Sequence, residues 1–504
     1  MKFALIFLCA VSWVECYKIL VVFSAASPSH FMLCNALGRG LAKAGHEVTV
    51  LSPFRDKNPP KNYREVVLTG FVENKEKVMP LNFFELENMH PWLSIYSMMS
   101  VSNTVNETFE HPNFKKLLNE KFDLIIMEQF VFESLKALSC HFNVPLIMFS
   151  IVGANLWSNI DTANPSPPSY IPDLGLSYSS KMNLWERTFN SLTVLINIFN
   201  NYLYYYPTQR KFVQKYLPKC ANYDFNNVSF YLMNSHESTS EPVPMVPNMI
   251  NIGGFHINPP KELPKDLKEY LDNAKDGVIY FSMGSNIQFS KVKPEIRDTL
   301  TKTLGKLKQK VLWKCDEDTL HGKPDNVKLG KWFPQSDILA HPNVKLFITH
   351  GGLLSTFETI YHGVPVLTLP VFGDQKLNAA RMETLGYGIK LTFSAITEPD
   401  LTEALNKLLN DPKYRENAKM RSKLFHDRPI KPMDEMIYWV EYIARYNGAP
   451  HLQVAGKHLP WYQYLLLDVV LLVVLIVTIP IVLLYIICKK LCCSGNEKKK
   501  QKKE

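Results

Sequence analysis

One histidine stands where a general base would be useful. Of the 14 histidines in the chain, only His30 lies between the first apolar strand, expected at residues 19–23, and the helical stretch at residues 31–44. Parallel α/β sheets bind ligands at the carboxyl ends of their strands, and the positive end of the helix keeps an imidazole neutral there. A neutral imidazole can accept a proton near neutral pH. An ordinary helix-capping histidine is the alternative, and without further information the position favours it.

Two carboxylates are candidates to orient that imidazole, one on each side of the apolar strand expected at residues 124–127. Asp123 precedes the strand and Glu128 follows it. A strand of about five residues separates its two ends by ~16 Å, and only the carboxyl end meets the ligand edge. We therefore predict that Glu128, rather than Asp123, orients His30.

A second group of residues could bind an anion. Residues 349–352, with the sequence THGG, end the strand expected at residues 344–349 and lead into a helix. Free backbone N–H groups and the helix dipole attract negative charge at such a turn, and glycines let a phosphate approach the backbone. Ser355 and Glu358 in the next turn match a capping box, a purely structural device, and their spacing alone favours that interpretation.

Alternating strands and helices must position these residues. Parallel sheets flanked by helices follow from this alternation, so the fold class is α/β with two Rossmann-like domains, residues 17–257 and 277–460. A proline-rich linker at residues 258–276 separates them, and helices after Thr397 and Met433 are expected to close the second domain. The expected elements are strands 47–51 and 144–150 and helix 132–141 in the first domain, and strands 278–282, 311–313, 327–329 and 364–369 and helices 295–308 and 355–361 in the second.

Aromatic side chains recur at helical spacing over residues 182–207. Packing together with contact to a lipid surface is one interpretation of this long helix. The other is that the helix lines a pocket for apolar substrates, and the pattern alone leaves both open.

The two ends of the chain predict a membrane protein. Residues 1–16 combine one lysine, an apolar run and small residues, as in a secretory signal peptide. Residues 465–487 carry one charge, Asp468, and are long enough to cross a bilayer, with aromatic residues before them and lysines after them. This arrangement predicts a single-pass type I protein with a luminal body and a basic cytosolic tail at residues 488–504. Lys500 and Lys502 resemble a dilysine retrieval signal, so we expect residence in the endoplasmic reticulum membrane; a basic stub touching anionic lipid is the alternative.

The composition is that of a large globular protein. The chain has 504 residues, of which 46% are apolar and 20% charged, so it can bury ample core and is neither disordered nor a disulfide scaffold. Its formal net charge is +9, but seven lysines lie in the last 16 residues with two glutamates. The body is therefore near neutral, which argues against nucleic acid as a partner.

Four cysteines belong to the predicted luminal body, namely Cys34, Cys140, Cys220 and Cys315. Their wide spacing, without paired histidines, makes a zinc site improbable, and the sequence does not decide whether any of them pair. Asn106 and Asn227 begin N-x-S/T sequons and are the predicted glycosylation sites.

Residues 332–378, WFPQSDILAHPNVKLFITHGGLLSTFETIYHGVPVLTLPVFGDQKLN, carry a specific family resemblance. They resemble the family 1 UDP-dependent glycosyltransferases, and among these the membrane-bound enzymes of animals, especially insects. The resemblance runs from Tyr17 to the lysine tail. It implies the GT-B fold, in which two Rossmann-like domains face each other, the C-terminal domain binds the nucleotide sugar and the N-terminal domain holds the acceptor.

The resemblance also implies roles for individual residues. It makes His30 the catalytic base, and it assigns Glu358 to the ribose hydroxyls rather than to a helix cap. Two departures stand out: Glu128 occupies a position where relatives commonly carry Asp, and Leu354 one where many carry Asn. The other implied roles are diphosphate contacts for Ser285, His350, Gly352 and Ser355, uracil contacts for Trp332 and Gln335, and sugar contacts for Asp374 and Gln375. Without the family, Trp332 would more ordinarily be a core residue, and Asp374 with Gln375 a polar loop.

The expected reaction is inverting transfer of a sugar from a UDP-sugar to a hydroxyl or similar group of small lipophilic acceptors, in detoxification or metabolite conjugation. UDP-glucose is the expected donor, with UDP-glucuronate second. No metal is expected, because no Asp-x-Asp suited to holding the diphosphate lies in the cleft-forming loops. A binding protein without turnover is the competing class. A nicotinamide dehydrogenase is excluded, because residues 24–29 hold no glycine. The sequence leaves a homo-oligomer open.

Overall fold

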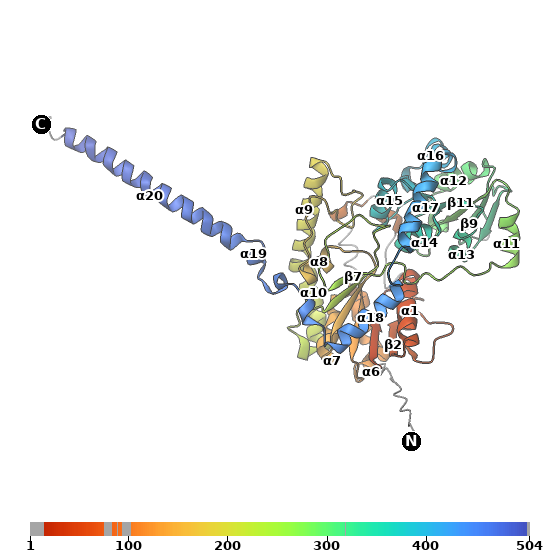
Figure 1. Cartoon of the computed structure of the whole chain (residues 1–504), viewed down its shortest axis with the longest axis horizontal. Coiled ribbons are helices and arrows are strands. Elements are labelled where there is room, and N and C mark those ends of the chain that lie inside the picture. The colour runs from red at the N-terminus through yellow and green to blue at the C-terminus, as the bar shows by residue number, and fades with distance from the viewer. Residues whose placement is uncertain (1–14, 75–82, 88, 93–101, 318, 501–504) are drawn as a thin grey trace, which may run out of the picture. The chain divides into compact units, whose positions relative to one another are not determined.

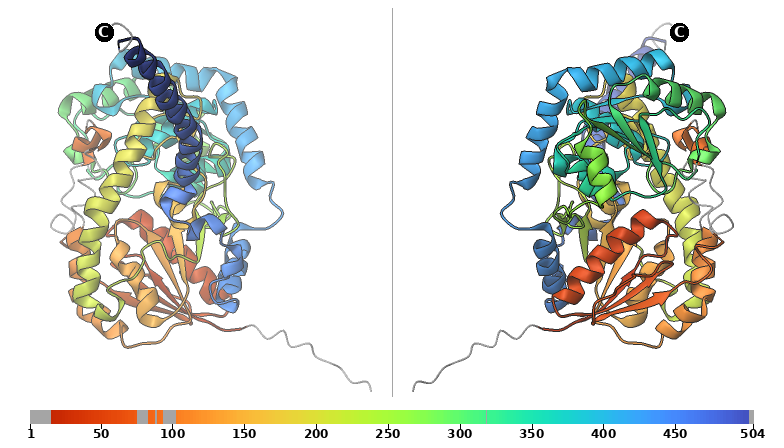
Figure 2. Two further views of the ribbon diagram at one scale, coloured as in Figure 1. Left: turned by 90° about the vertical axis from the view of Figure 1, so that its left-hand side faces the viewer. Right: turned by 90° about the vertical axis from the view of Figure 1, so that its right-hand side faces the viewer.

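A computed structural model describes residues 15–74, 83–87, 89–92, 102–317 and 319–500. The chain divides into two compact units, residues 1–452 and 453–504, and each is described by itself. The first unit contains two parallel β-sheets with helices around them (Figures 1 and 2). Most of the predicted signal peptide lies outside the described residues.

The first sheet has seven strands in the order β3-β2-β1-β4-β5-β6-β7, all parallel. Its central strands are buried on both faces, as expected of a parallel sheet covered by helices. Three of its strands, β3, β6 and β7, were not predicted. The strands are β1 (Lys18–Val22), β2 (Glu47–Ser52), β3 (Tyr63–Val67), β4 (Leu124–Gln129), β5 (Leu146–Ser150), β6 (Phe230–Met233) and β7 (Met249–Asn251).

We call residues 15–257 of the first unit, which contain this sheet, the first half, and residues 258–452 the second half. Helices of the first half cover this sheet. Where a helix was predicted at residues 132–141, the chain forms a 3₁₀ turn, η1, followed by a short α-helix. The expected aromatic helix is interrupted by one π-helical turn, η2, between α9 and α10. The helices are α1 (Pro28–Lys43), α3 (Phe83–Glu87), α5 (Ser102–Glu110), α6 (Pro112–Leu117), η1 (Glu133–Ala137), α7 (Leu138–Phe142), α8 (Leu156–Thr162), α9 (Leu184–Asn200), η2 (Asn201–Tyr205), α10 (Tyr206–Tyr216) and η3 (Pro218–Cys220).

The second sheet has six parallel strands in the order β10-β9-β8-β11-β12-β13. Two buried apolar clusters draw alternate residues from its strands, for example Ile279 and Phe281 in one and Val278 and Tyr280 in the other, so helices cover both faces. Its strands are β8 (Val278–Ser282), β9 (Lys310–Lys314), β10 (Val327–Gly330), β11 (Val344–Thr349), β12 (Val366–Thr368) and β13 (Gly388–Lys390). The helices are α11 (Lys265–Asp272), η4 (Phe289–Lys291), α12 (Pro294–Gly305), α13 (Gln335–Leu339), α14 (Leu353–His362), α15 (Gln375–Thr384), η5 (Phe393–Ala395), α16 (Glu398–Asn410) and α17 (Pro412–His426).

One helix joins the two halves in a way that the sequence did not predict. Helix α18 (Pro432–Arg445) was expected to close the second domain, yet it packs on the first, beside α1 (Figure 1). Met436, Val440 and Ile443 are buried in the core of the first sheet. The approach is close, because a Cβ on Gly40 of α1 would lie 2.2 Å from the sulfur of Met433.

The expected linker at residues 258–276 is part loop and part helix. Residues 258–264 form no regular element, whereas α11 occupies most of the remainder. Leu267 and Leu271 of this helix are buried in the second half's core. Apolar spacing within the helix explains why the chain packs there rather than remaining extended.

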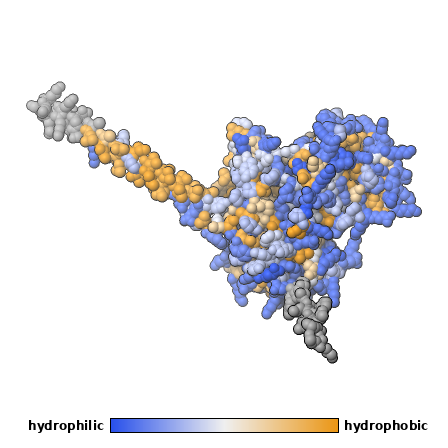
Figure 3. Space-filling view, viewed as in Figure 1, coloured by the Kyte–Doolittle hydropathy of each residue, from blue (hydrophilic) through white to orange (hydrophobic). Residues whose placement is uncertain are grey.

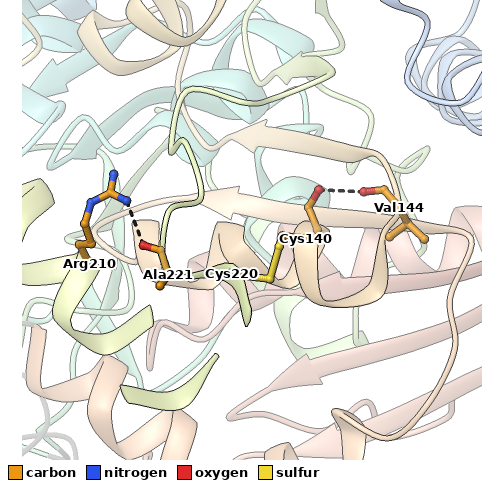
Figure 4. Close-up of a disulfide and its surroundings, with 6 residues drawn as sticks. Cys140, Val144, Arg210, Cys220 and Ala221 are labelled. Carbon is orange, nitrogen blue, oxygen red and sulfur yellow. Dashed lines mark hydrogen bonds between the residues drawn. A yellow bond between two sulfur atoms is a disulfide. The ribbon is translucent and has the colours of Figure 1, made fainter. Parts of the chain in front are cut away.

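A disulfide that the sequence left undecided joins Cys140 of α7 to Cys220 of η3, with the two Cα atoms 6.0 Å apart (Figure 4). The chain beside each cysteine is also hydrogen-bonded: Arg210 donates to the carbonyl of Ala221, and the hydroxyl of Ser139 donates to the carbonyl of Val144. Cys34 and Cys315 are free and buried.

The second unit contains a long apolar helix. The elements of this unit are η7 (Ala455–His458), α19 (Trp461–Tyr464) and the long helix α20 (Leu467–Lys500). Among the described residues, one helical segment is long and apolar enough to cross a membrane, Leu467–Leu491, with a mean hydropathy of 3.3 and no buried residue. Its apolar surface stands out in Figure 3. The segment overlaps the predicted span at residues 465–487 and extends four residues beyond it.

Candidate active site

The two halves of the first unit face each other across a cavity of about 360 Å³. This volume is within the range of small-molecule sites. His30 enters the cavity from the first half. Every nucleotide- or sugar-binding candidate predicted from the sequence lines it from the second half: Ser285, Trp332, Gln335, His350, Gly352, Ser355, Glu358, Asp374 and Gln375.

His30 and Glu128 form a hydrogen-bonded pair. Nδ1 of His30 lies 2.8 Å from Oε2 of Glu128, although 98 residues separate them in sequence. The Glu128 side chain is 1% exposed, and its Oε1 accepts the backbone N–H of Ala25 at 3.0 Å. The carboxylate is thus held at both oxygens. It fixes the imidazole with Nδ1 toward the protein, which leaves Nε2 to accept a proton.

The alternatives for these residues do not hold. Ser27 is the N-cap of α1 and Pro28 its first residue, so His30 lies within the first helical turn and is not a cap. Asp123 lies at the opposite end of β4, where its carboxylate accepts the backbone N–H of Lys18 at 2.7 Å. The structure therefore places Glu128 beside His30, as the strand-edge argument predicted.

Two glycines hold the ring of His350 between them. A Cβ on Gly284 would lie 2.6 Å from Cε1 of that ring, and a Cβ on Gly352 would lie 2.4 Å from Nε2. Gly284 also has a φ of +79°, which favours glycine. Burial, together with the nearby charge of Lys314, lowers the pKa of His350 to about 4. The imidazole is therefore neutral at physiological pH and acts as a hydrogen-bonding group rather than a cation.

Glu358 and Ser355 share one donor. Nε2 of Gln335 donates to Oγ of Ser355 at 3.0 Å and to Oε2 of Glu358 at 2.5 Å. Helix α14 begins at Leu353 with Gly352 as its N-cap, so Ser355 lies inside the helix and the capping-box alternative is wrong. Burial raises the pKa of Glu358 to about 7.

Trp332 is 66% exposed, which excludes the core role that an isolated tryptophan more often has. It lies in the turn between β10 and α13 and lines the cavity. An exposed indole at a cavity wall offers a flat apolar face for a planar ring.

Asp374 and Gln375 stand at the start of α15. Oε1 of Gln375 accepts the backbone N–H groups of Val371 and Phe372, at 2.8 and 3.1 Å, so the amide nitrogen is left for a ligand. Oδ2 of Asp374 accepts from Asn378 at 2.7 Å, and burial raises the pKa of Asp374. The pair offers one acceptor and one donor to a polyhydroxyl ligand.

Leu354 shows what its departure from the family pattern does. It belongs to α14 in the second half, yet its side chain packs against the first half's core. Phe31 and Ile151 belong to the same set of partly buried apolar side chains at that core. A leucine here contributes apolar contact across the cavity.

A separate set of contacts joins the halves beside α15. Nζ of Lys376 donates to the backbone carbonyl of Glu87 at 2.6 Å, and Oε1 of Glu87 accepts the backbone N–H of Ser394 at 2.9 Å. The rings of Phe84 and Phe393 stack with centroids 5.8 Å apart. Helix α3 of the first half is thus fastened to the residues that follow the sugar-binding candidates.

Lys314 is a cavity residue that the sequence analysis missed. It ends β9 and lines the cavity next to Trp332 and His350. The signal that could have found it is a lysine at the carboxyl end of a buried strand, the edge where ligands bind.

Among the described residues, no group of three or more histidine, cysteine, aspartate or glutamate side chains is placed to hold a metal ion. The two described acidic residues that follow β9 have other partners. Asp316 accepts from the backbone N–H of Phe289 at 2.7 Å, and Glu317 pairs with Arg297. Asp318 is outside the described residues.

The predicted glycosylation sites differ in their surroundings. Asn227 is exposed in the loop before β6. Asn106 lies on α5, where its side-chain oxygen accepts from the hydroxyl of Tyr216 at 2.7 Å.

Two parallel sheets that share a ligand cavity at their carboxyl edges define a Rossmann-like α/β fold, and comparison with solved structures identifies the fold as GT-B. A UDP-glucosyltransferase from Polygonum tinctorium, solved with 3,4-dichloroaniline, matches with a TM-score of 0.58 and 15% identity over 86% of this chain and 99% of its own. UDP-glucose: anthocyanidin 3-O-glucosyltransferase, solved with UDP, matches with a TM-score of 0.57 and 18% identity over 85% and 99%.

Residues 17–503 match the family described as "UDP-glucoronosyl and UDP-glucosyl transferase", and the chain belongs to it. UDP-glycosyltransferase UGT5 of Dactylopius coccus is 36% identical over 90% of this chain and 88% of its own. Human UDP-glucuronosyltransferase 2B7 is 31% identical over 90% and 89%. The protein is accordingly a UDP-glycosyltransferase that transfers a sugar from a UDP-sugar, and its C-terminal apolar helix fits a membrane anchor.

Proposed function

We propose that the protein transfers glucose from UDP-glucose, with inversion, to a hydroxyl or similar group of small lipophilic acceptors. The observation that carries the proposal is the His30–Glu128 pair, which faces the nucleotide- and sugar-binding candidates across one cavity. A base on one wall and a donor site on the other is the arrangement that direct displacement at the sugar's C1 requires.

In the proposed step, Nε2 of His30 takes the proton of the acceptor hydroxyl as its oxygen attacks C1 from the face opposite UDP. The carboxylate of Glu128 stabilises the imidazolium that forms, and Ala25 holds that carboxylate in place. The enzyme regains its free base when His30 releases the proton to solvent.

The departing UDP needs its growing negative charge stabilised. Ser285, His350 and Ser355 offer hydrogen-bond donors, and the N-terminus of α14 adds its dipole. Trp332 would stack on uracil, and Glu358 would accept from the ribose hydroxyls. We propose that no metal takes part, so an excess of EDTA should leave the rate unchanged.

The insect relatives support glucose as the donor. One protein of Dactylopius coccus that is 33% identical to this chain is named UDP-glucosyltransferase 2, whereas the mammalian relatives include UDP-glucuronosyltransferases. The apolar residues that line the cavity from the first half support a lipophilic acceptor, and they are Met32, Leu33, Ile151 and Val152. A role in detoxification or metabolite conjugation follows from that chemistry.

One assay tests the donor and the acceptor together. The full-length protein in microsomes should transfer labelled sugar to a panel of phenols from UDP-glucose and much more slowly from UDP-glucuronate, with the products identified by mass spectrometry. Faster transfer from UDP-glucuronate would overturn the donor assignment.

We also propose a single-pass type I arrangement in the endoplasmic reticulum membrane, with residues 17–460 in the lumen. The Cys140–Cys220 disulfide supports it, because disulfides persist in oxidising compartments. Glycans on Asn106 and Asn227 that endoglycosidase H removes would support this location. Deleting residues 500–504 should send the protein beyond the endoplasmic reticulum, and unchanged residence would overturn the role of the dilysine signal.

A further inference from the structure

Lys314 occupies the space between two of the proposed subsites. Its Nζ donates to the carbonyl of Gly284 at 2.8 Å and lies 4.7 Å from the ring centroid of Trp332. Gly284 in turn packs against the ring of His350 and precedes Ser285. The ammonium therefore stands between the proposed uracil platform and the proposed diphosphate donors.

No carboxylate within the described ranges forms an ion pair with this ammonium. Lys314 is the one lysine or arginine among the described residues that line the cavity. None of the ion pairs in the described part of the chain includes it, and burial lowers its pKa. A half-buried ammonium without a counter-ion is unfavourable. A ligand with a negative charge at this point would therefore supply the missing counter-ion and form a charge-assisted hydrogen bond with Lys314.

We propose that Lys314 binds the diphosphate of the UDP-sugar and stabilises the charge on the departing UDP. This inference rests on the proposed function, because it takes the cavity to be the nucleotide-sugar site. His350 is neutral, so Lys314 is the residue on that wall that can supply a full positive charge.

The step balances without a proton from Lys314. The bond between C1 and the β-phosphate oxygen breaks, and its electron pair stays on that oxygen. The acceptor oxygen forms the new bond to C1, and its proton goes to His30. Lys314 stays protonated throughout and donates to the phosphate oxygens, whose charge grows as the bond breaks.

A structural alternative is that Lys314 only braces the ring of Trp332. The two roles differ in what the ligand must carry. A brace affects every ligand that stacks on the tryptophan, whereas a phosphate contact affects only ligands with phosphate.

The experiment compares uridine with UDP on full-length protein in detergent, by calorimetry. In Lys314→Met, we expect the Kd for UDP to rise about 10- to 100-fold, as for loss of a hydrogen bond to a charged group, and the Kd for uridine to change less than about twofold. Lys314→Arg should restore part of the UDP affinity, because the charge is kept.

Lys310 offers a matched control on the same strand. Its Nζ also donates to a backbone carbonyl, that of Tyr270 at 3.3 Å, and lies 4.7 Å from the Tyr270 ring, but it does not line the cavity. Lys310→Met should leave both Kd values unchanged.

Two results would overturn the inference about Lys314 alone: equal losses for uridine and UDP in Lys314→Met, or no loss for either ligand. If the wild-type protein binds neither ligand, the nucleotide-site assignment itself fails, which is a separate result from either of these.

Discussion

In the cavity wall supplied by the second half, the polar side chains are hydrogen-bonded to one another. The wall supplied by the first half is instead mostly apolar around one polar pair. Gln335 ties Ser355 to Glu358, and Asn378 holds Asp374. On the first half, the His30–Glu128 pair stands among apolar side chains.

The difference shows how the two walls are suited to different ligands. Hydrogen bonds between binding residues fix their positions before a ligand arrives, which favours one well-defined polar ligand such as a nucleotide sugar. Apolar contacts are non-directional, so a wall built from them accepts ligands of varied shape provided that they are lipophilic. Only the base must be placed accurately on that wall, and it is.

The largest expected effect is on catalysis by the first half's wall, with no effect on UDP binding by the second half's wall. His30→Ala should lower kcat by about 10³-fold or more, since it removes the group that accepts the proton, while the Kd for UDP stays unchanged. Turnover by coupled assay and UDP affinity by calorimetry measure the two walls independently. Normal turnover in this variant would show that His30 is not the general base.

Glu128→Gln should give the next largest effect. The amide keeps the shape but stabilises the imidazolium less, so we expect kcat to fall about 10- to 1,000-fold, below the loss of ~10⁴ seen when a triad loses its carboxylate. The rate is measured with saturating donor and acceptor.

Asp123→Asn is the control for that variant, because its carboxylate accepts the backbone N–H of Lys18 at the opposite end of β4 from His30. It should lower the unfolding temperature or the yield and leave the turnover of folded enzyme nearly intact. A well-folded but inactive Asp123→Asn beside an active Glu128→Gln would reverse the assignment.

The affinity for UDP-glucose should depend on pH through Glu358, a residue of the second half. Burial raises the pKa of Glu358 to about 7 in the free enzyme, and in the proposed site the ribose hydroxyls would donate to its ionised form. Binding therefore favours loss of that proton, and affinity for UDP-glucose should rise about tenfold between pH 6 and pH 8 and then level off. Calorimetry in buffers of different ionisation enthalpy would detect the released proton.

Glu358→Gln is the matched test of that linkage, since the amide does not titrate. Its affinity should be lower at pH 8 and nearly flat with pH. UDP-glucose is the better probe than UDP, because the terminal phosphate of UDP titrates near pH 6. A slope that persists in Glu358→Gln would place the titrating group elsewhere.

The smallest effect concerns the join between the halves. Glu87→Ala removes the acceptor for the backbone N–H of Ser394 and should raise the KM for donor about two- to fivefold, with kcat little changed. Glu120→Ala is the control, because it breaks an exposed pair with Arg64 within the first half and should change neither constant. An equal KM change in both variants would show that α3 has no particular link to the donor wall.

Much of the fold was predictable because the signals are local. The predicted strands 278–282 and 344–349 coincide with β8 and β11, since an apolar run bounded by loop residues specifies a buried strand without reference to the rest of the chain. The strand β7 was missed because it has three residues, too few for a pattern. The π-helical turn η2 was missed because it keeps the apolar spacing of its neighbours.

The sequence by itself determined the alternation of elements, the glycine turn beside His350, the apolar span near the C-terminus and the family that residues 332–378 resemble. It also placed Glu128, rather than Asp123, at the same edge of the sheet as His30, because the carboxyl ends of parallel strands lie on one side of the sheet. Each of these depends on neighbours within a few residues or on a rule of parallel sheets.

Only the tertiary structure decided the Cys140–Cys220 pairing, the return of α18 to the first core, the attachment of Glu87 to the second half and the position of Lys314. Each joins residues distant in sequence or depends on how a side chain meets another element. Such contacts form only when the chain has folded and brought the distant residues together. Because the entropic cost of closing a loop rises only slowly with its length, many distant residues are comparably accessible as partners, and the local sequence does not indicate which one is chosen.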